Sequence, residues 1–209
     1  IIASCFATYY PITLKSNCHF EDKLKLCTIK FFQPAVFNPS RMGLFNRLVD
    51  TKSVPPHKKS IEIASPMSGT VVPLDEVPHA LFTGRVFGEG VAIKPSGYQV
   101  LAPFSGTMMH FPELANQIRI KAKNGLQLQI QLGIDSHLLM GEGFKRLVKQ
   151  QQQFEQGQLL AEFSLVKMKQ QLPSILCPIT ILNSDKIAAI QGHYFQVLPM
   201  QDTIMTLYI

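Results

Sequence analysis

Short alternating runs of apolar and polar residues dominate the chain beyond residue 60. Residues 126–132 alternate strictly, with leucine or isoleucine at every second position and glutamine between them. Shorter runs of the same kind occupy residues 61–64, 91–93 and 118–121. A period of two is that of a β-strand with one buried face, and glycine and proline separate the runs. The pattern therefore predicts an all-β fold, an antiparallel β-sandwich or barrel.

Helical periodicity is scarce in the same part of the chain. Residues 144–148 are the clearest candidate, and they suffice for one or two turns. We therefore expect few helices, all of them short.

One segment of the sequence occurs twice. Residues 65–72 (SPMSGTVV) reappear as residues 102–109 (APFSGTMM). In each copy a proline precedes a Ser-Gly turn, and threonine with the following apolar residues begins the next strand. Two copies in one core predict a duplicated β-motif with internal two-fold character.

The first 60 residues follow a different pattern. Residues 1–41 have no clear period, and we expect an unstructured extension or translated upstream sequence, with the protein itself beginning at Met42. Residues 42–60 are expected to hold a short amphipathic segment and then a linker, SVPPHKKS. The segment is too short to be a stable helix alone, so we expect a membrane surface or a partner groove to stabilise it, with a frayed tail as the alternative. Its apolar residues at helical spacing are Leu44, Phe45, Leu48 and Val49.

Composition and charge mainly exclude certain classes of protein and of partner. The chain is 46% hydrophobic and 16% charged, which is typical of a folded core. Its formal net charge is +6, but the basic residues are scattered without interleaved aromatics, so we expect no nucleic-acid partner. No apolar run is long enough to span a membrane, and no Cys-x-x-Cys pair occurs. We expect a cytoplasmic protein with no metal and no cofactor.

Ordered motifs cover the chain from residue 61 onward. They are IEIASPMSG (61–69), DEVP (75–78) with Phe82, GEGVAIKP (88–95), APFSGT (102–107), LGID (132–135) and GEGF (141–144). This series resembles the glucose-type enzyme IIA family of the bacterial sugar phosphotransferase system, and MGLF (42–45) resembles that family's N-terminal segment. The resemblance implies a single domain over residues 61–209, a sandwich of two antiparallel sheets, and a shallow apolar face that docks partners.

The resemblance also implies a phosphoryl-transfer role. In the family, the histidine phosphocarrier protein (HPr) donates a phosphoryl group to one imidazole, which a second histidine assists, and a IIB domain of a sugar permease then receives it. The matching positions here are Asn116 and Gln131. If residues 123–125 form a hairpin turn, paired residue numbers sum to about 247–249, which places these two side chains together. A carboxamide nitrogen is not a nucleophile, so we expect no phosphoryl transfer through this site.

We therefore expect a non-phosphorylatable regulator that binds HPr, a IIB domain, or a regulated permease or kinase. The resemblance implies that its partner-binding residues are Phe82, Val86, Phe87, Gly88 and Asp135, although ordinary core packing would also explain the apolar ones. His79 and Leu138 stand where carboxylates commonly rim the family's docking face, and Leu114 replaces a hydroxyl residue. Loss of acid there is expected to weaken docking of a basic HPr surface.

Two other functions stay open at the level of sequence. A working phosphocarrier would need a relocated acceptor, and His79, His110 and His137 fall in segments near the implied site. A biotinyl or lipoyl carrier domain is the remote alternative, because residues 65–72 and 157–168 resemble pieces of such domains, with Lys167 in place of the modified lysine. Lys167 lacks the tight hairpin that those domains use.

Overall fold

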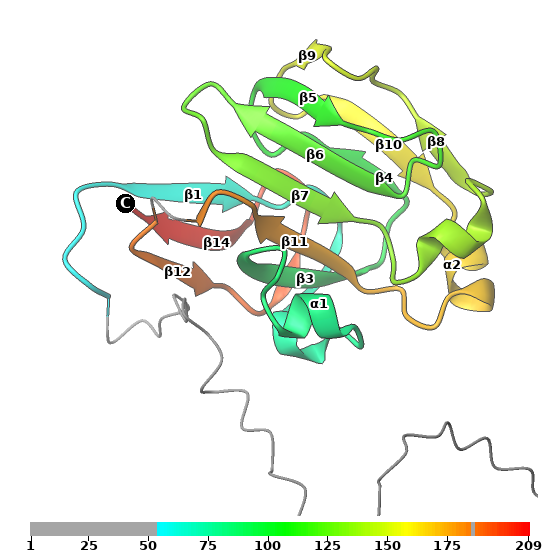
Figure 1. The fold of residues 1–209 in the computed structure, drawn as a ribbon, viewed down its shortest axis with the longest axis horizontal. Coiled ribbons are helices and arrows are strands. Elements are labelled where there is room, and N and C mark those ends of the chain that lie inside the picture. The colour runs from blue at the N-terminus through cyan, green and yellow to red at the C-terminus, as the bar shows by residue number, and fades with distance from the viewer. Residues whose placement is uncertain (1–53, 185–186) are drawn as a thin grey trace, which may run out of the picture. The chain divides into compact units, whose positions relative to one another are not determined.

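The computed structural model describes residues 54–184 and 187–209. The predicted extension 1–41 and the amphipathic residues Leu44, Phe45, Leu48 and Val49 lie outside this part of the chain. Within it, antiparallel strands form three sheets and the α-helices are short, which confirms the predicted all-β sandwich (Figure 1).

Eight strands form the largest sheet. In spatial order they are β13 (Gln196–Val197), β2 (Gly69–Pro73), β3 (Glu89–Pro95), β11 (Cys177–Ile181), β7 (Gln127–Gln131), β6 (Gln117–Ala122), β5 (Gly106–His110) and β9 (Gln153–Phe154). One small sheet contains β1 (Ser60–Ala64), β14 (Thr203–Tyr208) and β12 (Ala189–Gly192), and the other contains β4 (Gln99–Leu101), β10 (Leu159–Phe163) and β8 (Phe144–Arg146). In the part of the chain that the structure describes, the helical elements are the 3₁₀ turns η2 (Leu74–Glu76) and η3 (Ser136–Leu139) and the α-helices α1 (Ala80–Thr83) and α2 (Leu165–Gln171).

The sequence repeat occupies corresponding places in the two halves of the fold. The first copy links β1 of one small sheet to β2 of the large sheet, and the second copy links β4 of the other small sheet to β5. In the large sheet, β2 and β5 stand at the same distance from the central pair, β11 and β7. The duplication that the sequence predicts is thus a pairing of two similar halves across the β7–β11 junction.

A glycine begins the large-sheet strand in each copy, and the fold requires it there. A Cβ atom on Gly69 would lie 2.3 Å from the carbonyl oxygen of Lys94, and one on Gly106 would lie 2.2 Å from that of Lys121. Both oxygens belong to backbone that cannot move away cheaply. Any side chain at either position would therefore push neighbouring strands apart.

The hairpin of β6 and β7 has the register that the sequence predicts. Gln117 pairs with Gln131 and Lys121 pairs with Gln127, which lies inside the expected range. The turn is closed by the Asn124 side chain, whose Oδ1 accepts a hydrogen bond of 3.1 Å from the Leu126 amide. The alternating leucines and isoleucines of residues 126–132 are buried, as the period of two predicts.

Two hydrophobic clusters hold the described part together. The main one draws on all three sheets and contains Met67, Phe111, Ile130, Ile179 and Met205 among many others. A second, smaller cluster lies around the segment that leads through η2 and α1, and it consists of Leu74, Val77, Phe82, Ala92 and Ile134. The second cluster attaches this segment to strand β3 and to the loop after β7.

Two local expectations need comment. Residues 144–146 form strand β8 instead of a helical turn, because they pair with β10; Lys145 Nζ also lies 3.5 Å from Glu162 Oε2. The end of the predicted linker is ordered against the C-terminal residue, because the amides of Lys58 and Lys59 both donate to the carbonyl of Ile209. In both places pairing with distant backbone decides the local conformation.

The repeat glycines give a testable prediction. Gly106→Ala is expected to lower the free energy of unfolding by about 1–3 kcal/mol, because the new methyl group would overlap the backbone of β6. Chemical denaturation of the variant measures this loss. Gly97→Ala is the matched control, since its Cβ would meet only the Ser68 side chain at 3.2 Å. Equal stability of the two variants would contradict the close-approach argument.

Candidate functional site

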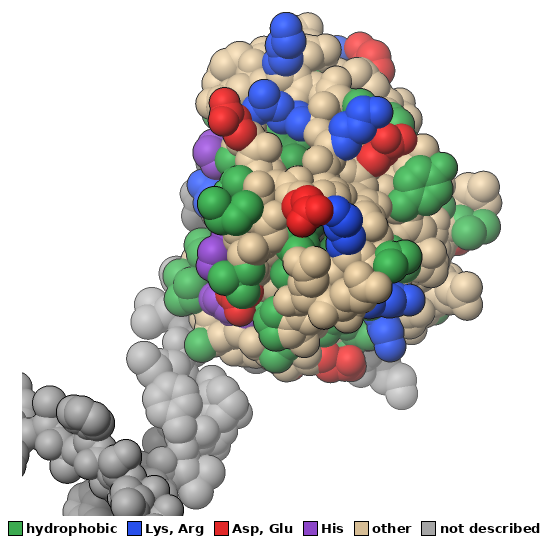
Figure 2. All heavy atoms as spheres, turned by 90° about the vertical axis from the view of Figure 1, so that its right-hand side faces the viewer, with side chains coloured by type: hydrophobic (Ala, Val, Ile, Leu, Met, Phe, Trp, Pro, Cys, Tyr) green, Lys and Arg blue, Asp and Glu red, His purple; other side chains and the backbone are tan. Residues whose placement is uncertain are grey.

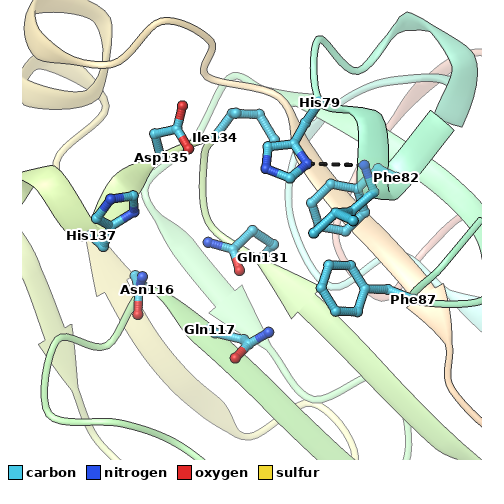
Figure 3. A pocket seen from close by; sticks show the side chains of 10 residues that line it. His79, Phe82, Phe87, Asn116, Gln117, Gln131, Ile134, Asp135 and His137 are labelled. Carbon is cyan, nitrogen blue, oxygen red and sulfur yellow. Dashed lines mark hydrogen bonds between the residues drawn. The ribbon is translucent and has the colours of Figure 1, made fainter. Parts of the chain in front are cut away.

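One shallow pocket collects most of the residues that the sequence singles out. Its volume is about 230 Å³, and it lies on the outer face of the large sheet beside α1 (Figure 3). The lining residues are His79, Leu81, Phe82, Phe87, Asn116, Gln117, Gln131, Ile134, Asp135 and His137. The aromatic side chains stand on one side of Gln131, and Asn116 and His137 stand on the other.

The floor of the pocket comes from the open end of the β6–β7 hairpin. Asn116 immediately precedes β6, and its carbonyl accepts a 2.8 Å hydrogen bond from the Leu132 amide. Ala115 bends the chain into this position with a left-handed φ of 52°. The structure thus brings Asn116 and Gln131 into one pocket, as the hairpin register predicts.

Gln117 is a floor residue that the sequence analysis did not name. It lies directly opposite Gln131 in the hairpin and lines the same pocket. The predicted register could have identified Gln117, because the numbers 117 and 131 add up to a value within the expected range for paired residues.

The amide of Gln131 is held in one orientation. Its Nε2 donates to the hydroxyl of Ser136 at 3.0 Å and to the carbonyl of Gly133 at 3.4 Å. Ser136 is fully buried, so this contact is shielded from water. The side-chain nitrogen of Gln131 therefore points toward η3, and its hydrogen atoms are donated to Ser136 and Gly133.

His79 contributes to the pocket from the beginning of α1. Its Nδ1 accepts a hydrogen bond of 3.3 Å from the Leu81 amide, which caps the helix (Figure 3). A neutral imidazole has one donor and one acceptor nitrogen, so this bond assigns the proton to Nε2. Nε2 of His79 then carries a hydrogen atom and has no lone pair to attack a phosphorus atom.

The other two candidate histidines differ in position. His137 lies in η3, is exposed, and lines the pocket next to Asp135. His110 ends strand β5 on the exposed surface and is not part of the lining. Of the three candidates, the structure therefore places His79 and His137 at the site.

Two chain segments that line the pocket also expose large apolar side chains. We define the docking surface as the lining residues Leu81 and Phe87 together with Val86, Leu138 and Met140, which belong to the same two chain segments that line the pocket. Val86, Leu138 and Met140 expose 64%, 63% and 80% of their surface, respectively. Figure 2 shows histidine and hydrophobic side chains gathered along one edge of the molecule, away from most of the charged ones. Exposure of large apolar side chains in a cluster is typical of a surface that binds another macromolecule.

Two of the predicted partner-binding residues have a different position from the exposed patch that was expected. Phe82 is only 4% exposed and belongs to the second hydrophobic cluster, although its edge lines the pocket. Gly88 has a left-handed φ of 91°, and a Cβ there would lie 2.0 Å from the carbonyl oxygen of Ile181. Gly88 thus allows the chain to approach β11, while Val86 and Phe87 present the surface.

The described residues offer neither a cluster of metal ligands nor a reactive thiol. No group of three or more histidine, cysteine, aspartate or glutamate side chains there is arranged to hold a metal ion. Burial raises the pKa of the Cys177 thiol to about 12, against a smaller lowering by its hydrogen bond with the Gly133 backbone. This thiol is therefore protonated at neutral pH and is no nucleophile.

The sequence profile of the EIIA 1 family of the phosphoenolpyruvate-dependent sugar phosphotransferase system matches residues 61–187. The chain belongs to this family. It is 32% identical over 168 residues to the glucose-specific EIIA component of Haemophilus influenzae, covering 79% of this chain and 99% of that protein. It is 34% identical over 152 residues to the corresponding protein of Buchnera aphidicola, covering 73% and 94%.

A solved structure of the same family has the same fold. Glucose permease IIA from Mycoplasma capricolum superposes with a TM-score of 0.65 at 27% identity, over 71% of this chain and 96% of that one.

Membership of the EIIA family argues against the biotinyl or lipoyl carrier domain as an alternative. Lys167 also lies within helix α2, where its ammonium group contacts the Glu142 carboxylate, and not at the tip of a hairpin. No helix in residues 54–184 or 187–209 is long and apolar enough to cross a membrane.

The tautomer of His79 is directly testable. In the neutral ring, long-range proton–nitrogen NMR spectra are expected to show the hydrogen on Nε2, because Nδ1 accepts from Leu81. His110 is the internal control, since its exposed ring has no such bond within the described chain and is expected to show a mixture of tautomers. A hydrogen on Nδ1 of His79 would contradict the capping geometry.

Proposed function

We propose that this chain is a IIA-type protein that binds partners of the sugar phosphotransferase system without carrying a phosphoryl group at Asn116 or Gln131. The observation that supports it most is the meeting of these two carboxamides in one pocket, at the positions where the resemblance puts the family's histidines. Reversible phosphoryl transfer needs a nitrogen lone pair that is free near neutral pH. The nitrogen of a carboxamide has no free lone pair, because that lone pair is delocalised into the carbonyl group.

The proposed activity is therefore docking. Exposed apolar side chains next to a pocket that is polar on one side and apolar on the other have the composition of a surface that binds another protein. HPr, a IIB domain, or a regulated permease or kinase would occupy the docking surface, in the cytoplasm. Contact of Leu44, Phe45, Leu48 and Val49 with a membrane would add a second point of attachment.

A second function has one observation in its favour. His137 lines the same pocket, is exposed, and has no ring hydrogen bond among the contacts of the described residues. It is the best placed relocated phosphoacceptor, because the Nε2 of His79 is protonated and His110 lies outside the pocket. A working phosphocarrier would then use a histidine on η3 in place of one on β7.

The mass of the intact protein distinguishes the two functions. The full chain is incubated with phosphoenolpyruvate, enzyme I and HPr, kept at alkaline pH, and analysed by mass spectrometry. We expect no phosphoryl adduct, because neither carboxamide can accept one. A stoichiometric, acid-labile adduct that maps to His137 and disappears in His137→Ala would establish the second function and show that the chain does more than dock partners.

Restoring two imidazoles gives the complementary prediction. Asn116→His combined with Gln131→His is expected to take up one acid-labile phosphoryl group in the same assay, because the hairpin register already brings these positions together. Gln127→His is the matched control, since it lies on the same face of β7 outside the pocket and is expected to stay unmodified. A folded double variant without an adduct would contradict the assignment of the site.

A further inference from the structure

The Arg85 guanidinium joins three segments beside the pocket. Its Nη2 lies 2.9 Å from Asp75 Oδ1 on η2, and its Nε lies 2.9 Å from Glu89 Oε2 at the beginning of β3. Its Nη1 donates to the carbonyl oxygens of Phe82 and Thr83, at 3.2 and 3.3 Å, at the end of α1. One side chain thus binds two carboxylates and two backbone carbonyls.

The segment that Arg85 holds builds the apolar half of the pocket. Four lining residues, His79, Leu81, Phe82 and Phe87, come from the chain between η2 and β3. The helix within it has only four residues and cannot be stable by itself. Among the described residues, the segment packs through the second hydrophobic cluster, in which Leu74, Val77 and Phe82 are grouped with Ala92 and Ile134, and Arg85 adds a polar attachment.

The ion pair between Arg85 and Glu89 is largely buried, which makes it costly to break. The Glu89 side chain is only 3% exposed and the Arg85 side chain 20% exposed, so their contact is largely shielded from water. Removal of Arg85 takes from this buried carboxylate the opposite charge that the 2.9 Å contact supplies, which is costly in a medium of low polarity. Lysine cannot replace the arginine, because a single ammonium group cannot reach two carboxylates and two carbonyls at once.

The loop between β12 and β13 brings Tyr194 within the electrostatic reach of the Arg85 site. The Phe195 carbonyl accepts from the Val71 amide at 2.9 Å, which fixes this loop to β2. Burial raises the pKa of the neighbouring Tyr194 phenol, while Arg85 lowers it and Asp75 and Glu89 raise it. The same three charges are therefore close to a residue of the C-terminal part of the chain, which places them at a junction of distant segments.

We propose that Arg85 is a positioning residue of the docking surface: it sets the place of α1 and residues 84–88, and with them the apolar wall that a partner contacts. This proposal rests on the docking function proposed above. Arg85 acts through Leu81, Val86 and Phe87, and it need not touch the partner itself.

The first test measures local order without any partner. Amide hydrogen exchange of Gly84, Val86 and Gly88, whose amides donate to backbone carbonyls of this segment, is followed by NMR in the full chain. We expect Arg85→Lys and Arg85→Met to accelerate it at least about tenfold, because hydrogen bonds to a charged group are lost. Arg146→Met is the matched control, since Arg146 also donates to a backbone carbonyl, that of Phe111, but far from this segment.

The double variant Arg85→Met with Glu89→Met separates positioning from general stability. Replacing a buried ion pair by apolar residues is often neutral for stability, so its melting temperature is expected to return close to that of the wild type. Exchange at Gly84, Val86 and Gly88 is expected to stay fast, since the carbonyls of Phe82 and Thr83 remain without the guanidinium. Wild-type exchange in the double variant, or in Arg85→Met, would overturn the proposal.

The second test uses unphosphorylated HPr as the probe, titrated into the labelled chain and followed by NMR. We expect the double variant to bind at least about tenfold more weakly than the wild type and Arg146→Met to bind equally well. Binding of the double variant with wild-type affinity would overturn the positioning role. If the wild type itself binds neither HPr nor an isolated IIB domain, the docking function proposed for these two partners fails, whereas the exchange experiment still decides whether Arg85 positions the segment.

Discussion

Strands β6 and β7 are joined by a short turn, and the register of this hairpin determines which side chains reach each face of the large sheet. Because side chains alternate along a strand, a shift of one residue would move Ile118, Leu128 and Ile130 out of the core. The same register sets Gln117 opposite Gln131 and ties the carbonyl of Asn116 to Leu132. The hydrophobic core and the floor of the pocket thus depend on one pairing, and neither can change without the other.

The pocket wall has a separate origin. The outer face of the sheet is polar near β6 and β7, and it turns apolar where the chain between η2 and β3 packs over Ala92 and Ile134. This segment contains no long element of secondary structure, so its position depends on a few contacts: the small cluster, the ring contact of Phe82 with Phe87 at 5.3 Å, and the Arg85 interactions. A pocket that is polar on one side and apolar on the other results from joining these two parts.

Chemistry at this site is limited by which nitrogen atoms are free. The nitrogen of Gln131 is a donor to Ser136, and Nδ1 of His79 is occupied by the Leu81 amide. Both groups are therefore arranged for hydrogen bonding and not for attack on a phosphoryl group. His137 is the one pocket imidazole in the described chain for which no such ring contact exists, which explains why the choice between binding and transfer depends on it.

The sequence alone predicted the strands at residues 61–64, 91–93, 118–121 and 126–132, the duplication and the hairpin register, because alternation and turn residues are local properties that leave a direct pattern in the chain. It also placed Asn116 and Gln131 together, since the register follows from one turn. It missed the strand at residues 144–146 and the roles of Gln117, Ser136 and Arg85. Those depend on contacts between segments far apart in sequence: β8 exists because β10 lies beside it, and Arg85 matters because Asp75, Glu89 and the end of α1 converge on it. Only the tertiary structure decided these features, because the free energy that fixes them comes from burial and pairing across the fold, which no local pattern records.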